Sequence, residues 1–216
     1  MNLSIIGTKG AGKGTQLKRL TADFNLLSFS PGDLFRAGVR QRTGLGRLAE
    51  KYVQSGQLVP DDIVDGLVTE WLSTVSPEQG IAFDGFPRTR TQTFFLEETF
   101  REMGRKLDVV LFLEVATETV MQRLFSRRVC SVCELEFHLT SHPFETCPLK
   151  KCEGQHLRQL EQDDPDVIRI LTNDFRSSIG PLLDYYQQTS RLIRINGEGE
   201  AEQVHAAIIE ALSPFR

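Results

Sequence analysis

The sequence has no long apolar run. No stretch approaches the ~20 residues that a membrane-spanning helix needs, and the amino-terminal segment lacks the basic start and long apolar centre of a secretory signal. We therefore expect a cytoplasmic protein with no membrane partner. Hydrophobic residues make up 40% and charged residues 25% of the 216 positions, which excludes disordered and collagen-like chains. This length suits one large domain, or a core with small inserts.

The chain also has no excess of positive charge. Lysine and arginine number 25 against 29 acidic residues, so the formal net charge is −4. Nucleic-acid-binding proteins are usually basic overall. The arginines are nevertheless concentrated locally, at Arg123, Arg127 and Arg128. This distribution favours a small anionic ligand over a polymer, and we expect no nucleic-acid partner.

Cysteines are few, and all four lie between positions 130 and 152. Close pairs in a chain without a secretory signal favour a metal over disulfides. The first pair, Cys130 and Cys133, has the usual knuckle spacing, whereas Cys147 and Cys152 are separated by four residues and are more loosely spaced. Four thiolates suit a closed tetrahedral zinc site. The sequence therefore predicts a structural Zn²⁺; the alternative is four free cysteines in a segment that has lost its metal.

Short apolar runs alternate with helical patterns along most of the chain. The runs that we interpret as strands are Leu3–Ile6, Leu27–Phe29, Ile81–Phe83, Val109–Val115 and Leu192–Ile195. The helical patterns are Thr15–Phe24, Asp61–Trp71, Arg90–Met103, Thr117–Arg128, Val167–Tyr186 and Ala201–Leu212. This alternation predicts an α/β fold with a doubly wound, parallel, five-stranded sheet between two helical layers.

Two segments interrupt the alternation. Residues 30–59 contain two short helical patterns where a simple crossover needs one, and residues 129–160 show no helical periodicity. We interpret both as inserts above the carboxyl edge of the sheet, where folds of this class bind ligands.

A glycine-rich loop follows the first expected strand and opens a helix. It spans Gly7–Thr15 and reads GTKGAGKGT. Glycines allow the tight turn that points N–H groups at phosphate oxygens, and a helix N-terminus adds partial positive charge. Lys13 can reach the outer phosphates and Thr15 can place a hydroxyl near Mg²⁺, although Gly14 separates the two. The alternative is a glycine-rich turn with no ligand. The residues expected to bind the donor phosphates are Gly10, Ala11, Gly12, Lys13, Gly14 and Thr15.

The same loop carries a family resemblance. Gly-x-x-Gly-x-Gly-Lys-Gly-Thr is the variant found in nucleoside monophosphate kinases, and the whole chain resembles the adenylate kinases. Further motifs that carry the resemblance are Ser30-Pro31-Gly32-Asp33 with Arg36, Asp84-Gly85-Phe86-Pro87-Arg88-Thr89 with Gln92, Arg123 with Arg127-Arg128, and Asn196-Gly197-Glu198.

The resemblance implies a division of the chain and an activity. A P-loop core would comprise residues 1–29, 60–126 and 161–216, an acceptor-binding insert residues 30–59, and a zinc-stapled lid residues 127–160. The implied reaction is reversible phosphoryl transfer from Mg·ATP to AMP, giving two ADP, by a monomeric protein.

The resemblance also implies roles for individual residues. Catalytic roles would fall to Lys13, Arg88 and Arg127. Beyond the loop, ATP would contact Arg123, Arg127, Phe137 and Gly199. AMP would contact Pro31, Arg36, Gln57, Leu58, Val59, Gly85, Arg88 and Gln92. Residues linked to Mg²⁺ would be Thr15, Asp33 and Asp84. Gln92 favours AMP, because kinases for pyrimidine monophosphates usually have Asn there and a short lid.

Some positions depart from the family pattern. In one consistent register, Leu160 and Leu171 stand where lid arginines are expected, and Arg158 and Arg169 each lie two positions away. On a helix such a shift turns a side chain to another face. These leucines leave open a nucleotide-binding paralogue with impaired transfer, acting as a sensor or partner-binding protein.

Two substitutions near the amino terminus matter as well. Lys9 replaces the usual Pro of the phosphate loop, and Pro31 replaces the usual Thr of the acceptor motif. Pro31 removes a hydroxyl and a backbone donor near the acceptor nucleoside. A kinase for another nucleoside monophosphate therefore remains a second alternative.

Overall fold

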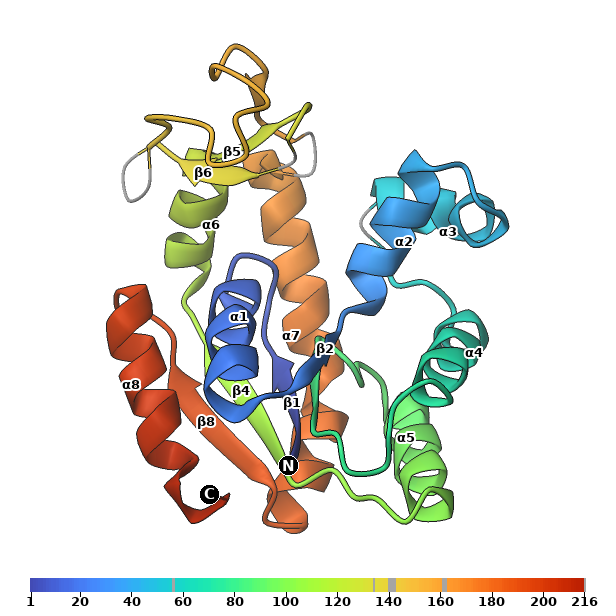
Figure 1. The fold of residues 1–216 in the computed structure, drawn as a ribbon. Helices are drawn as coiled ribbons and strands as arrows, with labels where there is room; N and C mark the ends of the chain where they lie inside the picture. The colour runs from blue at the N-terminus through green and yellow to red at the C-terminus, as the bar shows by residue number, and fades with distance from the viewer. Residues whose placement is uncertain (56, 134, 140–142, 161–162, 216) are drawn as a thin grey trace.

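A five-stranded parallel sheet forms the centre of the fold in the computed structural model, which describes residues 1–55, 57–133, 135–139, 143–160 and 163–215 (Figure 1). Its order is β2-β3-β1-β4-β8. The strands are β1 (Asn2–Ile6), β2 (Leu27–Phe29), β3 (Ile81–Asp84), β4 (Val109–Glu114) and β8 (Leu192–Asn196). Each of the five apolar runs forms one of them, so the predicted doubly wound α/β fold is confirmed.

Apolar side chains cover both faces of this sheet. Successive side chains along a strand point to opposite faces, and Ile5 and Ile6 accordingly lie in two different core clusters. Phe83 belongs to one cluster and Ala82 to the other. Continuous apolar strands are expected where helices cover both faces of a parallel sheet.

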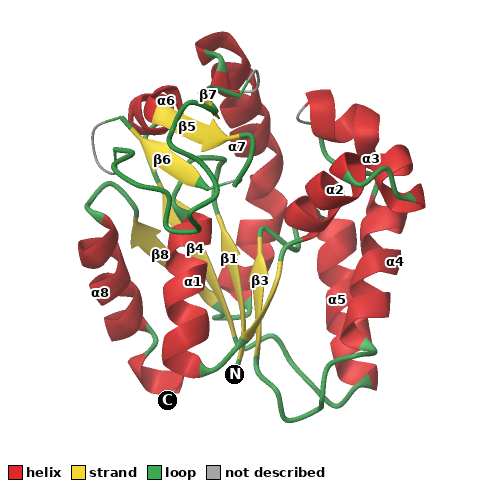
Figure 2. Ribbon diagram, turned by 45° about the horizontal axis from the view of Figure 1, so that its top comes forward, coloured by secondary structure: helices red, strands yellow, loops and turns green. Residues whose placement is uncertain are grey.

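Helices form the two outer layers (Figure 2). Buried side chains of α1 (Lys13–Phe24) and α8 (Ala201–Ala211) pack on one face, together with those of α6 (Thr117–Ser126). The other face packs against α4 (Asp61–Leu72), α5 (Arg90–Glu102) and α7 (Pro165–Gln188). The short 3₁₀ helix η2 (Ser213–Phe215) follows α8. None of the helices in the described ranges is both long enough and apolar enough to cross a membrane.

Two helices stand beside the carboxyl edge of the sheet rather than on its faces. They are α2 (Pro31–Arg40) and α3 (Gly44–Ser55), and they form the helical part of the segment 30–59. Their backbones meet at Gly38 and Gly46, where a Cβ on Gly46 would lie 2.0 Å from the Gly38 carbonyl oxygen. Only glycine fits at position 46, so this pair lets the two helix backbones approach closely.

A second, small sheet occupies the segment 127–160. It contains β5 (Arg127–Cys130), β6 (Glu136–His138) and β7 (Leu157–Arg158), which are antiparallel in the order β6-β5-β7. Figure 1 places this sheet and the α2–α3 pair on opposite sides of the loop that joins β1 to α1.

The sequence prediction was wrong about where the helix before this sheet ends. The helical pattern continues to Arg128, but α6 ends at Ser126 and the next residue is already extended. Arg128 pairs with Phe137, and Val129 with Glu136, across the β5–β6 ladder. Hydrogen bonding to a distant strand therefore overrides the local periodicity, and it turns the arginine at 127 out of the helix.

Candidate active site

The phosphate loop lies at the carboxyl end of β1, between Ile6 and the start of α1. Gly10 and Gly12 have φ angles of +81° and +95°, which other residues rarely adopt. Space is restricted as well, because a Cβ on Gly10 would lie 2.8 Å from the Leu124 side chain of α6. The glycines thus allow the chain to make the turn that the sequence predicts for this loop.

Lys13 begins α1 and is buried beneath the loop. Its Nζ donates hydrogen bonds to the carbonyl oxygens of Gly7 and Thr8, both at 2.9 Å. Burial lowers the pKa of Lys13 to about 8, and Asp84 opposes that shift. The positive charges of Arg88, Arg36 and Lys9 lower this pKa further. Cations from several elements therefore face the same loop lysine.

Asp84 is the last residue of β3 and Arg88 follows it, next to the loop. Nε of Arg88 donates to the Gly85 carbonyl at 2.8 Å, and burial lowers the pKa of the guanidinium. Gly85 has a φ of +64°, and a Cβ there would lie 2.8 Å from Arg88 Nη2. The Oδ1 atom of Asp84 is buried without a hydrogen-bond partner among the described residues. Because buried polar atoms are normally paired, this oxygen fits a water of hydration of Mg²⁺.

Thr15, the other core residue expected near Mg²⁺, is exposed on the first turn of α1.

A buried ion network joins the phosphate loop to the segment before α7. The side chain of Asp163 is 0% exposed and accepts hydrogen bonds from Arg127 Nε at 2.8 Å and Nη2 at 2.7 Å. Nζ of Lys9 donates to the same carboxylate at 2.8 Å. Arg127 also pairs with Glu136 at 3.2 Å. Burial alone would raise the pKa of Asp163, but Arg127 and Lys9 hold it below its usual value.

Sequence reasoning missed this network. It assigned no role to Asp163 and recorded Lys9 only as a departure from the family pattern. The two residues are 154 positions apart, and no local pattern links them.

Arg123 and Phe137 were both expected to contact ATP. Arg123 Nη2 donates to the carbonyl oxygens of Gly197 at 2.8 Å and Gly199 at 3.3 Å, and Nη1 reaches the Ala11 carbonyl at 3.4 Å. The guanidinium thereby joins the phosphate loop to the last loop of the core. Phe137 is only 4% exposed and packs edge-on against Phe144, with ring centroids 5.0 Å apart. Almost none of its ring faces solvent.

The expected AMP residues fall into exposed and buried groups. Arg36, with a half-exposed side chain on α2, pairs with Asp33. The charge of Arg36 nevertheless lowers the pKa values of Lys9, Lys13 and Arg88, so the guanidinium is close enough to the loop to influence them. Pro31 and Val59 are buried, and Gln57 and Leu58 are exposed.

Gln92 is 4% exposed and already makes two hydrogen bonds. Its Nε2 donates to Asp61 Oδ1 at 2.7 Å, and its Oε1 accepts from the Arg88 backbone N–H at 2.8 Å. An amide can make four hydrogen bonds. One N–H and one lone pair therefore remain for a nucleobase edge.

Leu160 and Leu171, which stand at expected arginine positions in the register described above, are both half-buried. Leu160 lies between β7 and α7, and Leu171 lies on α7. Arg169 pairs with Asp166 at 3.1 Å on the exposed surface of α7. Glu161 and Gln162 lie outside the described residues.

The cysteines gather in the small sheet and the loops around it. Sγ of Cys152 lies 3.4 Å from that of Cys130 and 3.7 Å from that of Cys133. Sulfurs bound to one tetrahedral zinc lie about 3.8 Å apart, given Zn–S bonds of about 2.3 Å. These three sulfurs form a group that could hold a metal ion. The cysteine cluster is therefore compatible with structural zinc.

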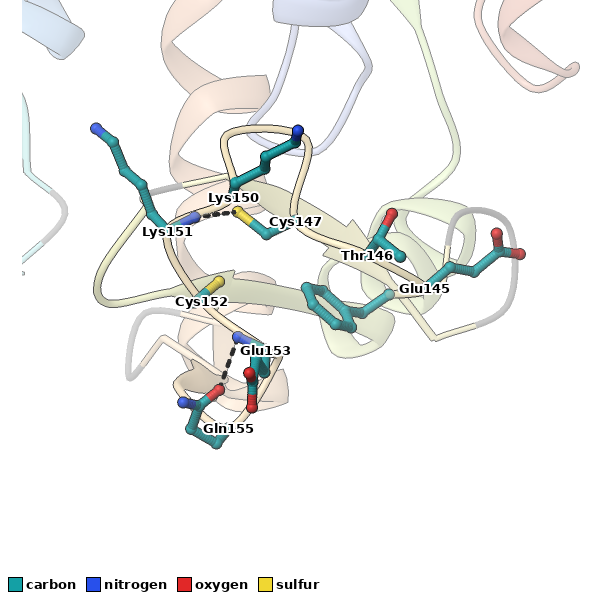
Figure 3. A pocket seen from close by; sticks show the side chains of 9 residues that line it. Glu145, Thr146, Cys147, Lys150, Lys151, Cys152, Glu153 and Gln155 are labelled. Atoms are coloured by element: carbon teal, nitrogen blue, oxygen red, sulfur yellow. Dashed lines mark hydrogen bonds between the residues drawn. The ribbon is translucent and has the colours of Figure 1, made fainter.

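Backbone N–H groups also point at two of the sulfurs. Those of Cys133 and Val132 donate to Cys130 Sγ, and that of Lys151 donates to Cys147 Sγ at 3.4 Å (Figure 3). These bonds lower the pKa values of Cys130 and Cys147 to about 7. The pocket in Figure 3 is lined by residues of the segment 144–155, so it opens on the cysteine loop and not on the phosphate loop.

The chain is similar in sequence to known adenylate kinases. The family model described as adenylate kinase matches residues 5–191. The adenylate kinase of Bacillus subtilis strain 168 is 37% identical over 216 residues, which cover all of both chains. The adenylate kinase of Desulforamulus reducens is 38% identical over 213 residues, covering 98% of this chain and all of the relative. That of Bacillus velezensis is 36% identical over 98% of both chains.

These matches run along essentially the whole chain, including the central sheet, the α2–α3 segment and the small sheet. On this similarity, together with the phosphate loop and the cations around it, the chain belongs to the adenylate kinase family.

Proposed function

We propose that the chain transfers a phosphoryl group reversibly from Mg·ATP to AMP, giving two ADP. The observation that carries this proposal is the convergence of Lys13, Arg88, Arg36 and Arg127 on the phosphate loop in a member of the adenylate kinase family. Nothing in the comparisons favours a paralogue with impaired transfer or a kinase for another monophosphate.

Positioning and charge neutralisation provide most of the catalysis in such a reaction. The loop and Lys13 hold the donor phosphates. Arg36 and Arg88 hold the α-phosphate of AMP in line with them. Arg127 neutralises charge on the group that moves. Mg²⁺, with waters held by Asp84, would screen the donor phosphates when bound.

The two inserts have separate roles in this proposal. Residues 30–59 form the acceptor-binding insert, and Gln92 reads the AMP base from the core with its remaining N–H and lone pair. Residues 127–160 form the lid, and its Arg127 reaches the phosphates with Nη1 while Nε and Nη2 stay bonded to Asp163. The exposed positions Gln57 and Leu58 offer backbone to the acceptor base, as Val59 does from its buried position.

An assay with ATP and each nucleoside monophosphate tests the proposal. We expect two ADP per AMP consumed and the highest kcat/KM with AMP, because a glutamine amide complements the adenine edge. Activity confined to another monophosphate would contradict the assignment of AMP.

Lys13→Ala tests whether the phosphate loop is the donor site. The substitution removes the mobile charge at the outer phosphates and should lower kcat/KM by at least ~10²-fold. An unchanged rate would show that the phosphate loop is not the donor site.

We further propose that Cys130, Cys133, Cys147 and Cys152 bind one structural zinc ion. The Sγ spacing supports Cys130, Cys133 and Cys152 as ligands. Cys147 lies outside that group, and the N–H bond from Lys151 to its sulfur supports it as the fourth ligand. Elemental analysis of the freshly purified protein should find one zinc per chain. Cys147→Ser should clearly lower the melting temperature and change AMP binding little, whereas the neighbouring Thr146→Ser should change neither. Four thiols that titrate in the native, zinc-free protein would contradict the site.

The leucines predict a specific kinetic defect. If Leu160 and Leu171 occupy arginine positions, nucleotides still bind normally, but the moving phosphoryl group is less well neutralised, so kcat is low. Leu171→Arg, alone or with Leu160→Arg, should then raise kcat by roughly tenfold, a change of 1.4 kcal/mol. Ile170→Arg is the matched control, because Ile170 is exposed on the same helix. If Leu171→Arg gains no more than Ile170→Arg, the leucines cause no defect in transfer.

A further inference from the structure

Lys9 is a second lysine of the phosphate loop, and the proposed mechanism does not use it. Its side chain is 31% exposed, and its Nζ lies 2.8 Å from Asp163 Oδ1. The same carboxylate accepts two hydrogen bonds from Arg127. Lys9 therefore stands directly beside the arginine to which the mechanism assigns the moving phosphoryl group.

The electrostatic neighbours of Lys9 locate its ammonium further. Burial lowers the pKa of Lys9 to about 8, while Asp163 opposes the shift. The charges of Arg127, from the lid segment, and Arg36, from the acceptor-binding segment, add to the lowering. Lys9 in turn lowers the pKa of Lys13. The ammonium thus lies among cations assigned to the donor and to the acceptor, and with a pKa near 8 it remains charged at pH 7.

The ion network can release Lys9 at little cost. Asp163 keeps its two bonds from the Arg127 guanidinium when the lysine leaves, so the buried carboxylate stays paired. An unpaired buried charge would be costly. The lysine also has a flexible stem, which lets the ammonium follow a phosphate oxygen.

We propose that Lys9 is a further catalytic residue of this reaction, whose ammonium moves from Asp163 to the phosphoryl group in flight. The inference rests on the proposed ATP:AMP transfer. In that step the bond between the γ-phosphorus and the β–γ bridging oxygen breaks, and a bond to an oxygen of the AMP phosphate forms. The bridging oxygen keeps the electron pair and leaves with ADP. Lys9 keeps its proton and contributes charge only.

Lys9 would then supply positive charge that Leu160 and Leu171 lack. Both leucines are neutral, and Arg169 is paired with Asp166 on the exposed surface of α7. A cation on the phosphate loop would thus act beside Arg127 on the transferred group.

The test compares Lys9→Met and Lys9→Arg with wild type in single-turnover transfer from ATP to AMP. Lys9→Met keeps the length of the side chain and removes its charge. We expect it to lower the transfer rate by roughly 10²-fold, with the dissociation constants of AMP and ADP changed less than threefold. Lys9→Arg should retain most of the rate. Lys106→Met controls for loss of a lysine, because Lys106 precedes β4 at the opposite edge of the sheet and is 83% exposed.

A second measurement separates catalysis from a purely structural bridge between the loop and Asp163. The ADP–tetrafluoroaluminate–AMP complex mimics the planar phosphoryl group in flight. A catalytic Lys9 predicts that Lys9→Met weakens this complex by a factor similar to the loss of rate. In the Asp163→Asn background, where the bridge is already disrupted, Lys9→Met should still lower the rate.

The outcomes distinguish this inference from the proposed function. If wild type transfers and Lys9→Met is within threefold of it, Lys9 is not catalytic and the proposed function stands. If Lys9→Met slows transfer but leaves the tetrafluoroaluminate complex unchanged, the lysine acts only through structure and the inference is wrong. If wild type transfers nothing from ATP to any monophosphate, the proposed function fails and this inference fails with it.

Discussion

Repulsion among cations at the carboxyl edge of the sheet is the constraint on which the site depends. Lys13 and Arg88 are buried there, and Lys9, Arg36 and Arg127 stand close enough to influence one another. Like charges in partly desolvated positions destabilise a folded chain unless anions or dipoles oppose them. Loop carbonyls oppose the charge of Lys13, and the Gly85 carbonyl accepts from Arg88. Asp163 holds Lys9 and Arg127, and Asp33 pairs with Arg36.

These internal partners are of the kind that a polyphosphate can replace. Carbonyl oxygens carry only partial charge, so a phosphate oxygen offers each cation a stronger hydrogen bond. The sheet makes this arrangement rigid, because β1 and β3 are adjacent parallel strands and end at the same edge. Asp163 extends the arrangement to the segment before α7.

Much of the fold could be predicted from the sequence because its signals are local. Each strand of the central sheet is a short apolar run, and the phosphate loop follows β1 directly. The end of α6 could not be predicted, since Arg127 and Arg128 continue a helical pattern and only pairing with β6 makes them extended. Lys9 and Asp163 meet across 154 positions. The burial of Phe137 against Phe144 depends on how the small sheet folds back, which no periodicity records.

In the site, too, local motifs could be predicted from the sequence and long-range contacts could not. Lys13, Asp84, Arg88 and the cysteine pairs belong to contiguous motifs, so their residue types and spacing indicate a role. The partners that hold Gln92, namely Asp61 and the Arg88 backbone, lie on different elements. A side chain can be recognised as a candidate from its motif, but its remaining hydrogen-bonding capacity becomes visible only when its partners are known.

The central claim is that bound phosphate replaces the internal partners of Lys9 and Lys13. Proton uptake on ATP binding tests this claim most directly. With pKa values of about 8 in the free protein, Lys9 and Lys13 are each roughly half deprotonated at pH 8. Bound phosphates favour the charged form and raise both pKa values, so binding must take up protons. Calorimetry at pH 8 in two buffers of different ionisation enthalpy should find uptake approaching about one proton per ATP, with little at pH 6.5. A binding enthalpy independent of the buffer at pH 8 would contradict the account.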